Sequence, residues 1–166
     1  MVAAEHARRA EAMPVDSPER RRLPPLLRRA WYGLNQTFRR RISHLDLTPD
    51  QFTVMRTLLE TGGITQRELT QMMSSDPNTV ASLLERMERA GLLERRPHEK
   101  DRRAHRLHLQ PAGKRKYHQA REIAVALQTE LLSVLPERKR EEFLEHLALV
   151  ADACRDAAEK SPKRGK

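Results

Sequence analysis

The sequence predicts a mainly α-helical protein into which one short β-hairpin is inserted. Over most of the 166 residues, apolar side chains recur at three- and four-residue spacing, the period of helices that bury one face. Between residues 92 and 110 the pattern changes to alternation on either side of a charged turn, which is the period of paired strands. Residues 1–22 and 160–166 are charged and poor in apolar side chains. We therefore expect a flexible N-terminal arm and a basic disordered tail around a folded region at residues 23–159.

Two short helices are predicted before the hairpin, at residues 48–59 and 65–73. Thr48 is an N-cap followed by a proline in the first turn. Thr65, with Glu68 three residues later, fits a capping box. A pair of glycines separates the two helices.

The third helix, at residues 76–91, has a signal at each end. Ser75 or Asp76 can cap its N-terminus ahead of Pro77, and Gly91 can end it. One face is apolar and must lie against a core; it carries Val80, Leu83, Leu84 and Met87. The opposite face carries Asn78, Thr79, Ser82, Arg86 and Arg89. That mix suits base edges and phosphates in a major groove, although a solvated helix face can have the same composition.

The hairpin carries basic residues along its strands and at its tip. On the returning strand, Leu107 and Leu109 face one way while Arg106 and His108 face the other. In the turn, Asp101 can hold a neighbouring arginine by a bidentate bridge. An arginine held in this way is well shaped to enter a minor groove. Taken alone, the turn would equally fit an exposed charged loop.

The order helix, turn, helix, turn, helix and hairpin is that of a winged helix-turn-helix with a two-stranded β wing. Residues 91–114 read GLLERRPHEKDRRAHRLHLQPAGK. This segment resembles the wing of the MarR family of transcriptional regulators in its Gly-Leu, paired arginines, proline, Asp-Arg-Arg, alternating strand and Pro-x-Gly. The resemblance extends over residues 23–158. The sequence departs from the family pattern at His98 and Gln110, where a small or acidic residue and a threonine are usual.

The resemblance implies a wing in which Asp101 braces the tip, Arg103 enters the minor groove and Arg102 contacts phosphate. Together with the polar face of the third helix, it implies that the partner is double-stranded DNA. The residues expected to contact DNA are Thr65, Gln66, Asn78, Thr79, Ser82, Arg86, Arg95, Arg102 and Arg103.

Three more helices are predicted outside this DNA-binding lobe of residues 46–110, which makes about six in all. They lie at residues 23–42, 111–135 and 137–158. Each has more apolar surface than a small winged helix can cover from within. We therefore expect an all-helical dimerisation region, formed by residues 23–45 and 111–159. The resemblance implies a homodimer whose paired recognition helices meet major grooves about 34–36 Å apart on a pseudo-palindromic operator.

The resemblance also implies a repressor that a small aromatic or phenolic ligand releases. The residues that could line a cleft for such a ligand are Trp31, Phe38, His44, Phe52, Met55 and Tyr117. Aromatic residues of amphipathic helices also serve as core residues, so this set has two interpretations. The single cysteine, Cys154, lies in an apolar stripe and is interpreted as a buried structural thiol.

Composition agrees with a nucleic-acid partner. The 32 Lys and Arg residues exceed the 23 Asp and Glu residues, for a formal net charge of +9, and the excess favours DNA over a membrane surface because no cationic amphipathic anchor is present. No apolar run has the length of a transmembrane helix or the pattern of a signal peptide. We therefore expect a cytoplasmic protein.

The sequence contains none of the patterns typical of enzymes or metal sites. It has no Ser-His-Asp signature, no glycine-rich phosphate loop and no convergent carboxylate pair. His105 and His108 face opposite sides of a strand and are interpreted as surface or phosphate-facing. No catalytic residue, metal or cofactor is therefore expected. Two alternatives keep the same fold: a non-specific architectural DNA-binding protein and a protein-interaction winged helix, which would normally expose apolar anchors on its wing.

Overall fold

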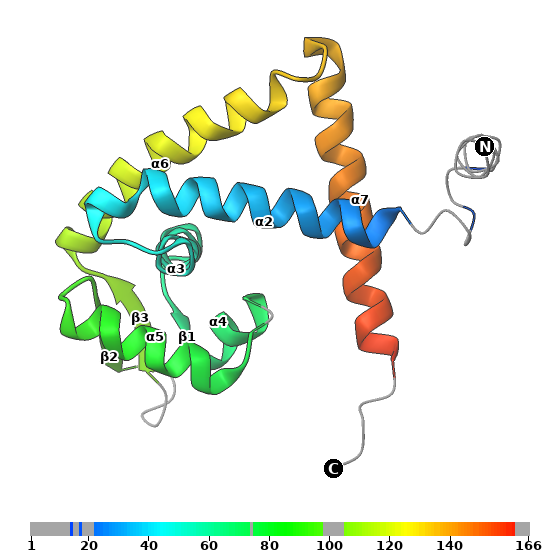
Figure 1. Cartoon of the computed structure of the whole chain (residues 1–166). Coiled ribbons are helices and arrows are strands. Elements are labelled where there is room, and N and C mark those ends of the chain that lie inside the picture. Colours follow the sequence, from blue (N-terminus) through cyan, green and yellow to red (C-terminus); the bar gives the residue numbers. More distant parts are fainter. Residues whose placement is uncertain (1–13, 15–16, 18–21, 74, 98–104, 162–166) are drawn as a thin grey trace. The chain divides into compact units, whose positions relative to one another are not determined.

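The computed structural model describes residues 14, 17, 22–73, 75–97 and 105–161, which are mainly helical with one small sheet (Figure 1). The elements are α2 (Leu23–Arg41), η1 (Ser43–Leu45), α3 (Pro49–Thr61), β1 (Ile64–Thr65), α4 (Gln66–Met72), α5 (Pro77–Arg89), β2 (Leu93–Pro97), β3 (His105–Leu109), α6 (Pro111–Leu132), η2 (Glu137–Lys139) and α7 (Arg140–Lys160). Contacts divide the chain within α6 into one unit that ends at Ile123 and a second that begins at Ala124. Most of the predicted N-terminal arm and most of the predicted basic tail lie outside the described residues.

Local hydrogen bonds account for the starts of α3 and α4. The Thr48 hydroxyl accepts from the Gln51 N–H (3.2 Å), and the Gln51 side-chain oxygen accepts from the Thr48 N–H (2.9 Å). Thr65 and Glu68 form the same reciprocal pair, at 3.3 and 2.8 Å. Each capping box satisfies N–H groups that the first turn of a helix leaves without a partner. The capping box predicted for residues 65–68 is confirmed.

Helix α5 also begins and ends as its sequence predicts. Asp76 rather than Ser75 is the N-cap, and its Oδ2 accepts from the Thr79 N–H at 2.9 Å. At the other end Gly91 has φ +66°, the left-handed conformation that glycine adopts without strain. The N–H of Leu92 then bonds to the carbonyl of Met87 at 2.9 Å, which closes a Schellman motif.

The sheet has three strands in the order β1-β3-β2: the two predicted strands of the wing, β2 and β3, and a strand β1 that was not predicted. The hairpin pairs Leu93 with Leu109 and Arg96 with Arg106, and the additional strand β1 pairs Ile64 with Leu107. Two residues are too few for strand alternation to be visible in a sequence. β1 forms because the preceding glycines have φ of +69° and +114°, which turns the chain from the end of α3 onto the edge of β3.

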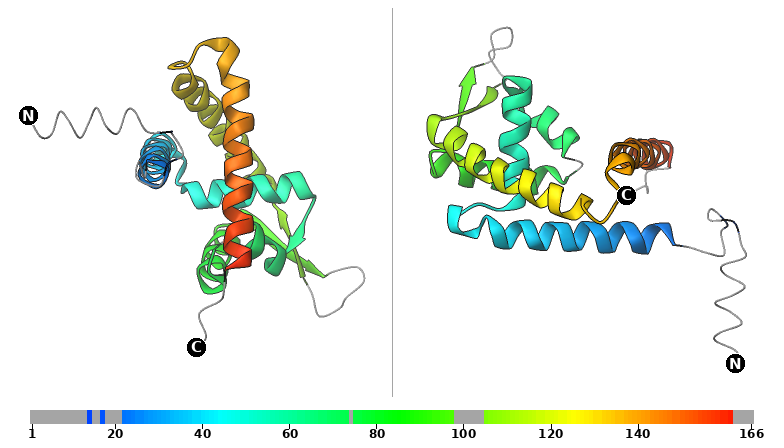
Figure 2. Two further views of the ribbon diagram at one scale, coloured as in Figure 1. Left: turned by 90° about the vertical axis from the view of Figure 1, so that its right-hand side faces the viewer. Right: turned by 90° about the horizontal axis from the view of Figure 1, so that it is seen from above.

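The core of the first unit lies where α5 and the sheet meet α3 and α4. The four apolar side chains predicted to face this core from α5 are all buried: Val80, Leu83, Leu84 and Met87. Leu107 and Leu109 are buried as well, whereas Arg106 and His108 are partly exposed, so the predicted alternation on β3 is confirmed. Figure 2 gives two further views of the sheet and the helices around it. The buried face and the caps at both ends together set the direction of α5.

The second unit comprises the end of α6, η2 and α7, and most of its large apolar side chains are exposed in the single chain. Those at least 38% exposed are Val125, Leu131, Val134, Phe143, Leu147 and Leu149. Leu127 is buried, at 1% exposure, and the remaining leucines of the unit and Val150 are partly exposed. Cys154 is exposed, so the expectation of a buried thiol was wrong; no residue of α7 is buried in this chain by itself. Among the described residues, no helix is long and apolar enough to span a membrane.

Candidate DNA-binding site

The polar face of α5 is open to solvent. Its exposed side chains are Asn78, Thr79, Ser82, Arg86 and Arg89. Because the apolar face is buried at the same time, the helix can rotate little about its axis, and this polar face is held outward. The Thr79 hydroxyl also donates to Asp76 Oδ2 at 3.2 Å. The arrangement offers short hydrogen-bonding side chains near the N-terminus of α5 and two arginines farther along, as a helix in a major groove requires.

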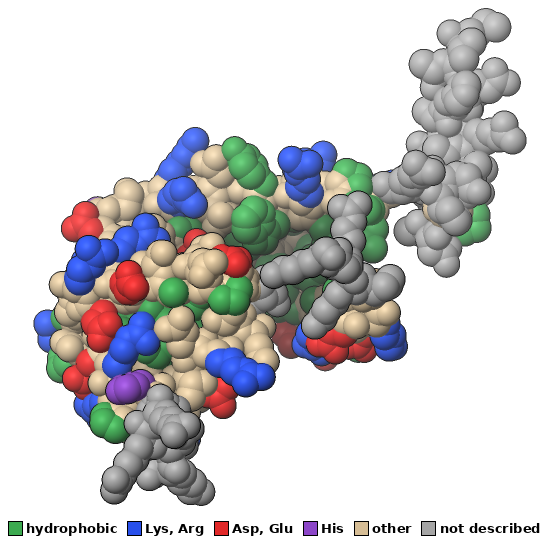
Figure 3. Space-filling view, turned by 90° about the horizontal axis from the view of Figure 1, so that it is seen from below, with side chains coloured by type: hydrophobic (Ala, Val, Ile, Leu, Met, Phe, Trp, Pro, Cys, Tyr) green, Lys and Arg blue, Asp and Glu red, His purple; other side chains and the backbone are tan. Residues whose placement is uncertain are grey.

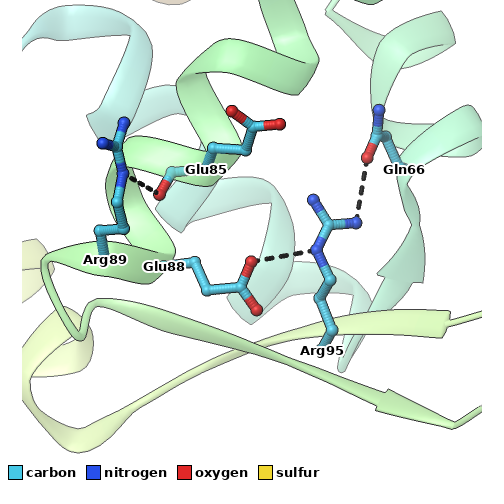
Figure 4. A network of polar contacts seen from close by, with 5 residues as sticks. All are labelled: Gln66, Glu85, Glu88, Arg89 and Arg95. Carbon is cyan, nitrogen blue, oxygen red and sulfur yellow. Dashed lines mark hydrogen bonds and ion pairs between the residues drawn. The ribbon is translucent and has the colours of Figure 1, made fainter.

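Arg95 links the wing to both helices of the helix-turn-helix. It lies on β2, its Nε donates to Glu88 Oε2 of α5 at 3.1 Å, and its Nη1 donates to Gln66 Oε1 of α4 at 3.1 Å (Figure 4). Arg89, by contrast, bonds back to the Glu85 carbonyl of its own helix, at 3.4 Å. The sequence placed Gln66 and Arg95 among separate DNA contacts. Their contact with each other could not be read from it, because nothing in the local pattern joins residues this far apart.

Arg95, Glu88 and Gln66 lie on one face of the hairpin. The opposite face carries a charged cluster formed by Glu94, Arg96, Arg106 and His108. Arg96 Nε donates to Glu94 Oε1 at 2.7 Å, and the side chain of Arg96 is 61% exposed. Burial, followed by the positive charge of Arg96, lowers the pKa of His108 below its ordinary value. His108 is partly exposed, and its lowered pKa favours the neutral imidazole; that it faces phosphate, which the sequence left open, stays a prediction.

Cationic and acidic side chains are interspersed over the surface of this region (Figure 3). On α5, Arg86 and Arg89 alternate with Glu85 and Glu88, and Glu88 is neutralised by Arg95. A purely electrostatic polyanion-binding surface would concentrate charge of one sign. Here charged groups flank uncharged hydrogen-bonding side chains, an arrangement suited to sequence reading.

A shallow hollow of about 460 Å³ lies beside the start of α5. Its lining comes from α4 and the first residue of α5 and consists of Gln66, Arg67, Thr70, Gln71 and Pro77.

Thr65, another predicted DNA contact, has its hydroxyl engaged with Glu68 Oε2 at 2.8 Å. The tip residues Asp101, Arg102 and Arg103 lie outside the described residues.

The structure brings together three of the six residues proposed for a ligand cleft. The Phe38 and Phe52 rings meet edge to face with centroids 5.0 Å apart, and Tyr117 stacks on Phe52 at 5.4 Å. Met55 is fully buried, while Trp31 is 64% exposed and His44 is also exposed. A second hollow, of about 220 Å³, lies beside His108; neither it nor the hollow at α4 is lined by any of these six residues. No group of three or more metal-ligating side chains occurs among the described residues.

Comparisons with known proteins agree with this architecture. The sequence model of the MarR family matches residues 47–105. The chain is 30% identical over 125 residues to the transcriptional regulator HosA of Escherichia coli, a match that covers 72% of this chain and 93% of HosA. The chain belongs to the MarR family. A shorter match, 35% identical over 82 residues, covers 49% of this MarR-family chain but only 56% of the HTH-type transcriptional regulator YsmB of Bacillus subtilis.

Solved structures of MarR-family proteins share the fold. A mutant of E. coli MarR complexed with operator DNA has a TM-score of 0.72 at 25% identity, over 80% of this chain and 95% of that one. The transcriptional repressor CouR bound to a 23-mer DNA duplex has a TM-score of 0.70 at 28% identity, over 76% and 89%. As a member of the MarR family, this protein is a DNA-binding transcriptional regulator and not an enzyme.

Proposed function

We propose that this protein is a homodimeric repressor that acts in the cytoplasm on a pseudo-palindromic operator. The exposed polar face of α5, fixed from behind by four buried apolar side chains, is the observation that carries the proposal. In it, α5 enters the major groove through Asn78, Thr79, Ser82 and Arg86, with Thr65 and Gln66 beside it at the start of α4. The wing tip reaches the minor groove through Arg103, held by Asp101, and Arg102 contacts phosphate.

The exposed apolar side chains support the dimer. Besides those of the second unit, α2 exposes Leu23, Leu26, Trp31, Tyr32 and Leu34, each by 42% or more. A single chain rarely leaves so much apolar side-chain surface in water, and burial against a second copy would remove it. A two-fold dimer also presents two α5 helices to one duplex, as a pseudo-palindromic site requires.

Repression and its release are proposed on different grounds. CouR, which has the same fold, is described as a repressor, and a dimer bound across a promoter would block it sterically. A small aromatic or phenolic ligand could release the DNA by entering beside the ring cluster of Phe38, Phe52 and Tyr117 and shifting the spacing of the recognition helices. The three rings are in contact in this structure, so a ligand would pack against the cluster from outside.

The test is a selection of genomic fragments on the purified protein, followed by binding to the enriched duplex and to a scrambled duplex across a range of salt concentrations. We expect a pseudo-palindromic site that is bound at least about 10³-fold more tightly than the control. Equal binding of both duplexes with a steep salt dependence would instead indicate a non-specific architectural protein. Trp31 fluorescence during titration with phenolic acids tests the proposed ligand.

A further inference from the structure

The amide of Gln66 has its orientation set by Arg95. A guanidinium group carries only donors, so the amide must turn its oxygen toward Arg95. It does so, with Oε1 accepting from Arg95 Nη1 at 3.1 Å. Figure 4 shows the amide nitrogen of Gln66 pointing away from the guanidinium. The two N–H donors of that nitrogen are left for another partner.

Glu88 in turn sets the orientation of Arg95. Its carboxylate accepts from Arg95 Nε at 3.1 Å, and because the guanidinium is planar and rigid, a fixed Nε also fixes Nη1. The side chains of Arg95 and Glu88 are 30% and 40% exposed, so the ion pair adds little to stability. Its effect is geometric, since it ties the first residue of α4 to α5 through the wing.

Gln66 occupies a place where a fixed amide would meet DNA. It is the first residue of α4 and lines the hollow that Pro77, the first residue of α5, also borders. An unconstrained glutamine can pair with adenine by donating to N7 and accepting from N6. Arg95 turns the oxygen that this pairing needs toward the wing and engages one of its two lone pairs. In this orientation Gln66 presents its two N–H donors on the side away from Arg95, while the oxygen faces the guanidinium.

We propose that Arg95 is a positioning residue and that Gln66, oriented by it, is a specificity-determining residue that selects a base with a keto oxygen. In the major groove guanine presents two acceptors, N7 and O6, and thymine presents O4, whereas adenine places the N6 donor beside its N7 acceptor and cytosine presents the N4 donor. This inference rests on the proposed function, because it requires α4 and α5 to face an operator. It assigns Arg95 to the orientation of Gln66 rather than to a direct DNA contact.

The test measures binding of the full-length protein to its selected operator and to every single-base-pair variant of that operator. Gln66→Met removes both donors at similar side-chain length. It should make one symmetric pair of operator positions indifferent to base, with a loss of roughly 3- to 10-fold for guanine or thymine there. Arg95→Met should relax preference at the same positions and admit adenine. The double variant should equal Gln66→Met alone.

Two further variants make the outcome decisive. Gln66→Glu still accepts from Arg95 but presents only acceptors, so the preference at these positions should change toward cytosine. Arg96→Met is the matched control, because it removes the same charge from the neighbouring residue of β2 on the opposite face. It should leave the preference at these positions unchanged.

Each contrary result has a distinct meaning. An Arg95→Met variant that weakens binding equally at every position would identify Arg95 as a phosphate contact and overturn the inference. So would a Gln66→Met variant that keeps every base preference of the wild type. If the wild-type protein itself shows no sequence preference, the proposed function fails together with the inference.

Discussion

The imidazole ring of His108 lies so close to Gly63 that a side chain on residue 63 would overlap it. A Cβ atom built on Gly63 would lie 2.4 Å from His108 Cε1, and Gly63 has φ +114°. The contact fastens the turn after α3 to β3, the strand against which β1 pairs. It explains how a two-residue strand holds its place at the edge of the wing sheet.

Gly63→Ala should therefore destabilise the protein by about 1–3 kcal/mol, because alanine is strained at this φ and its Cβ would displace the ring of His108. Chemical denaturation measures this difference. Gly62→Ala should cost less, since Gly62 has φ +69°, within the left-handed region, and open space around its Cβ position. Gly33→Ala, in open space within α2, should be neutral or slightly stabilising. Equal stabilities of the Gly63 and Gly33 variants would contradict the close contact.

His108 should make the stability of the protein depend on pH. Burial and the neighbouring Arg96 lower its pKa in the folded state, so the unfolded chain binds a proton more readily. The stability that neutral His108 contributes to the folded state is therefore fully present above about pH 6.5, the ordinary pKa of imidazole. It is lost as the pH falls toward the lowered pKa of the folded state. His108→Gln should flatten the decline in the free energy of unfolding below that pH. His105→Gln, at an exposed position of the same strand, is the control, and identical profiles for wild type and His108→Gln would refute the assignment.

Leu149→Glu should dissociate the proposed dimer without unfolding its chains. Leu149 is 66% exposed in the single chain, so a charge there costs little until a partner covers it. Sedimentation equilibrium should show a monomer with unchanged helical circular dichroism. Leu127→Glu should instead reduce the folded fraction, because Leu127 is buried within the chain. Gln128→Glu on exposed α6 surface controls for added charge. An intact Leu149→Glu dimer would remove this residue from the interface.

Arg103→Ala should weaken operator binding by roughly 1–3 kcal/mol per subunit and leave the dimer intact. Asp101→Ala should have nearly the same effect, because an unbraced arginine loses its orientation. Fluorescence anisotropy with the selected operator measures both. Lys100→Ala serves as a control for loss of charge in the same turn. Wild-type affinity of Arg103→Ala would refute the minor-groove assignment.

Much of the fold could be predicted because its signals are local. The capping box at Thr65, the N-cap at Asp76 and the Schellman motif at Gly91 join atoms three to five residues apart. The apolar stripe of α5 follows from helix geometry alone. The order of these elements then determined the winged helix-turn-helix arrangement and, with the charge of the wing, DNA as the partner.

What the sequence by itself determined is thus the order of the main helices and of the hairpin, the caps of α3, α4 and α5, and the faces that α5 and β3 bury. Only the tertiary structure decided that Arg95 meets Gln66, 29 residues away, that β1 joins the sheet, and that Leu127 is buried while Cys154 is exposed. The physical reason is the range of the interactions. Hydrogen bonds and periodic burial within one element depend on neighbouring residues, whereas contacts between elements depend on how several of them pack at once.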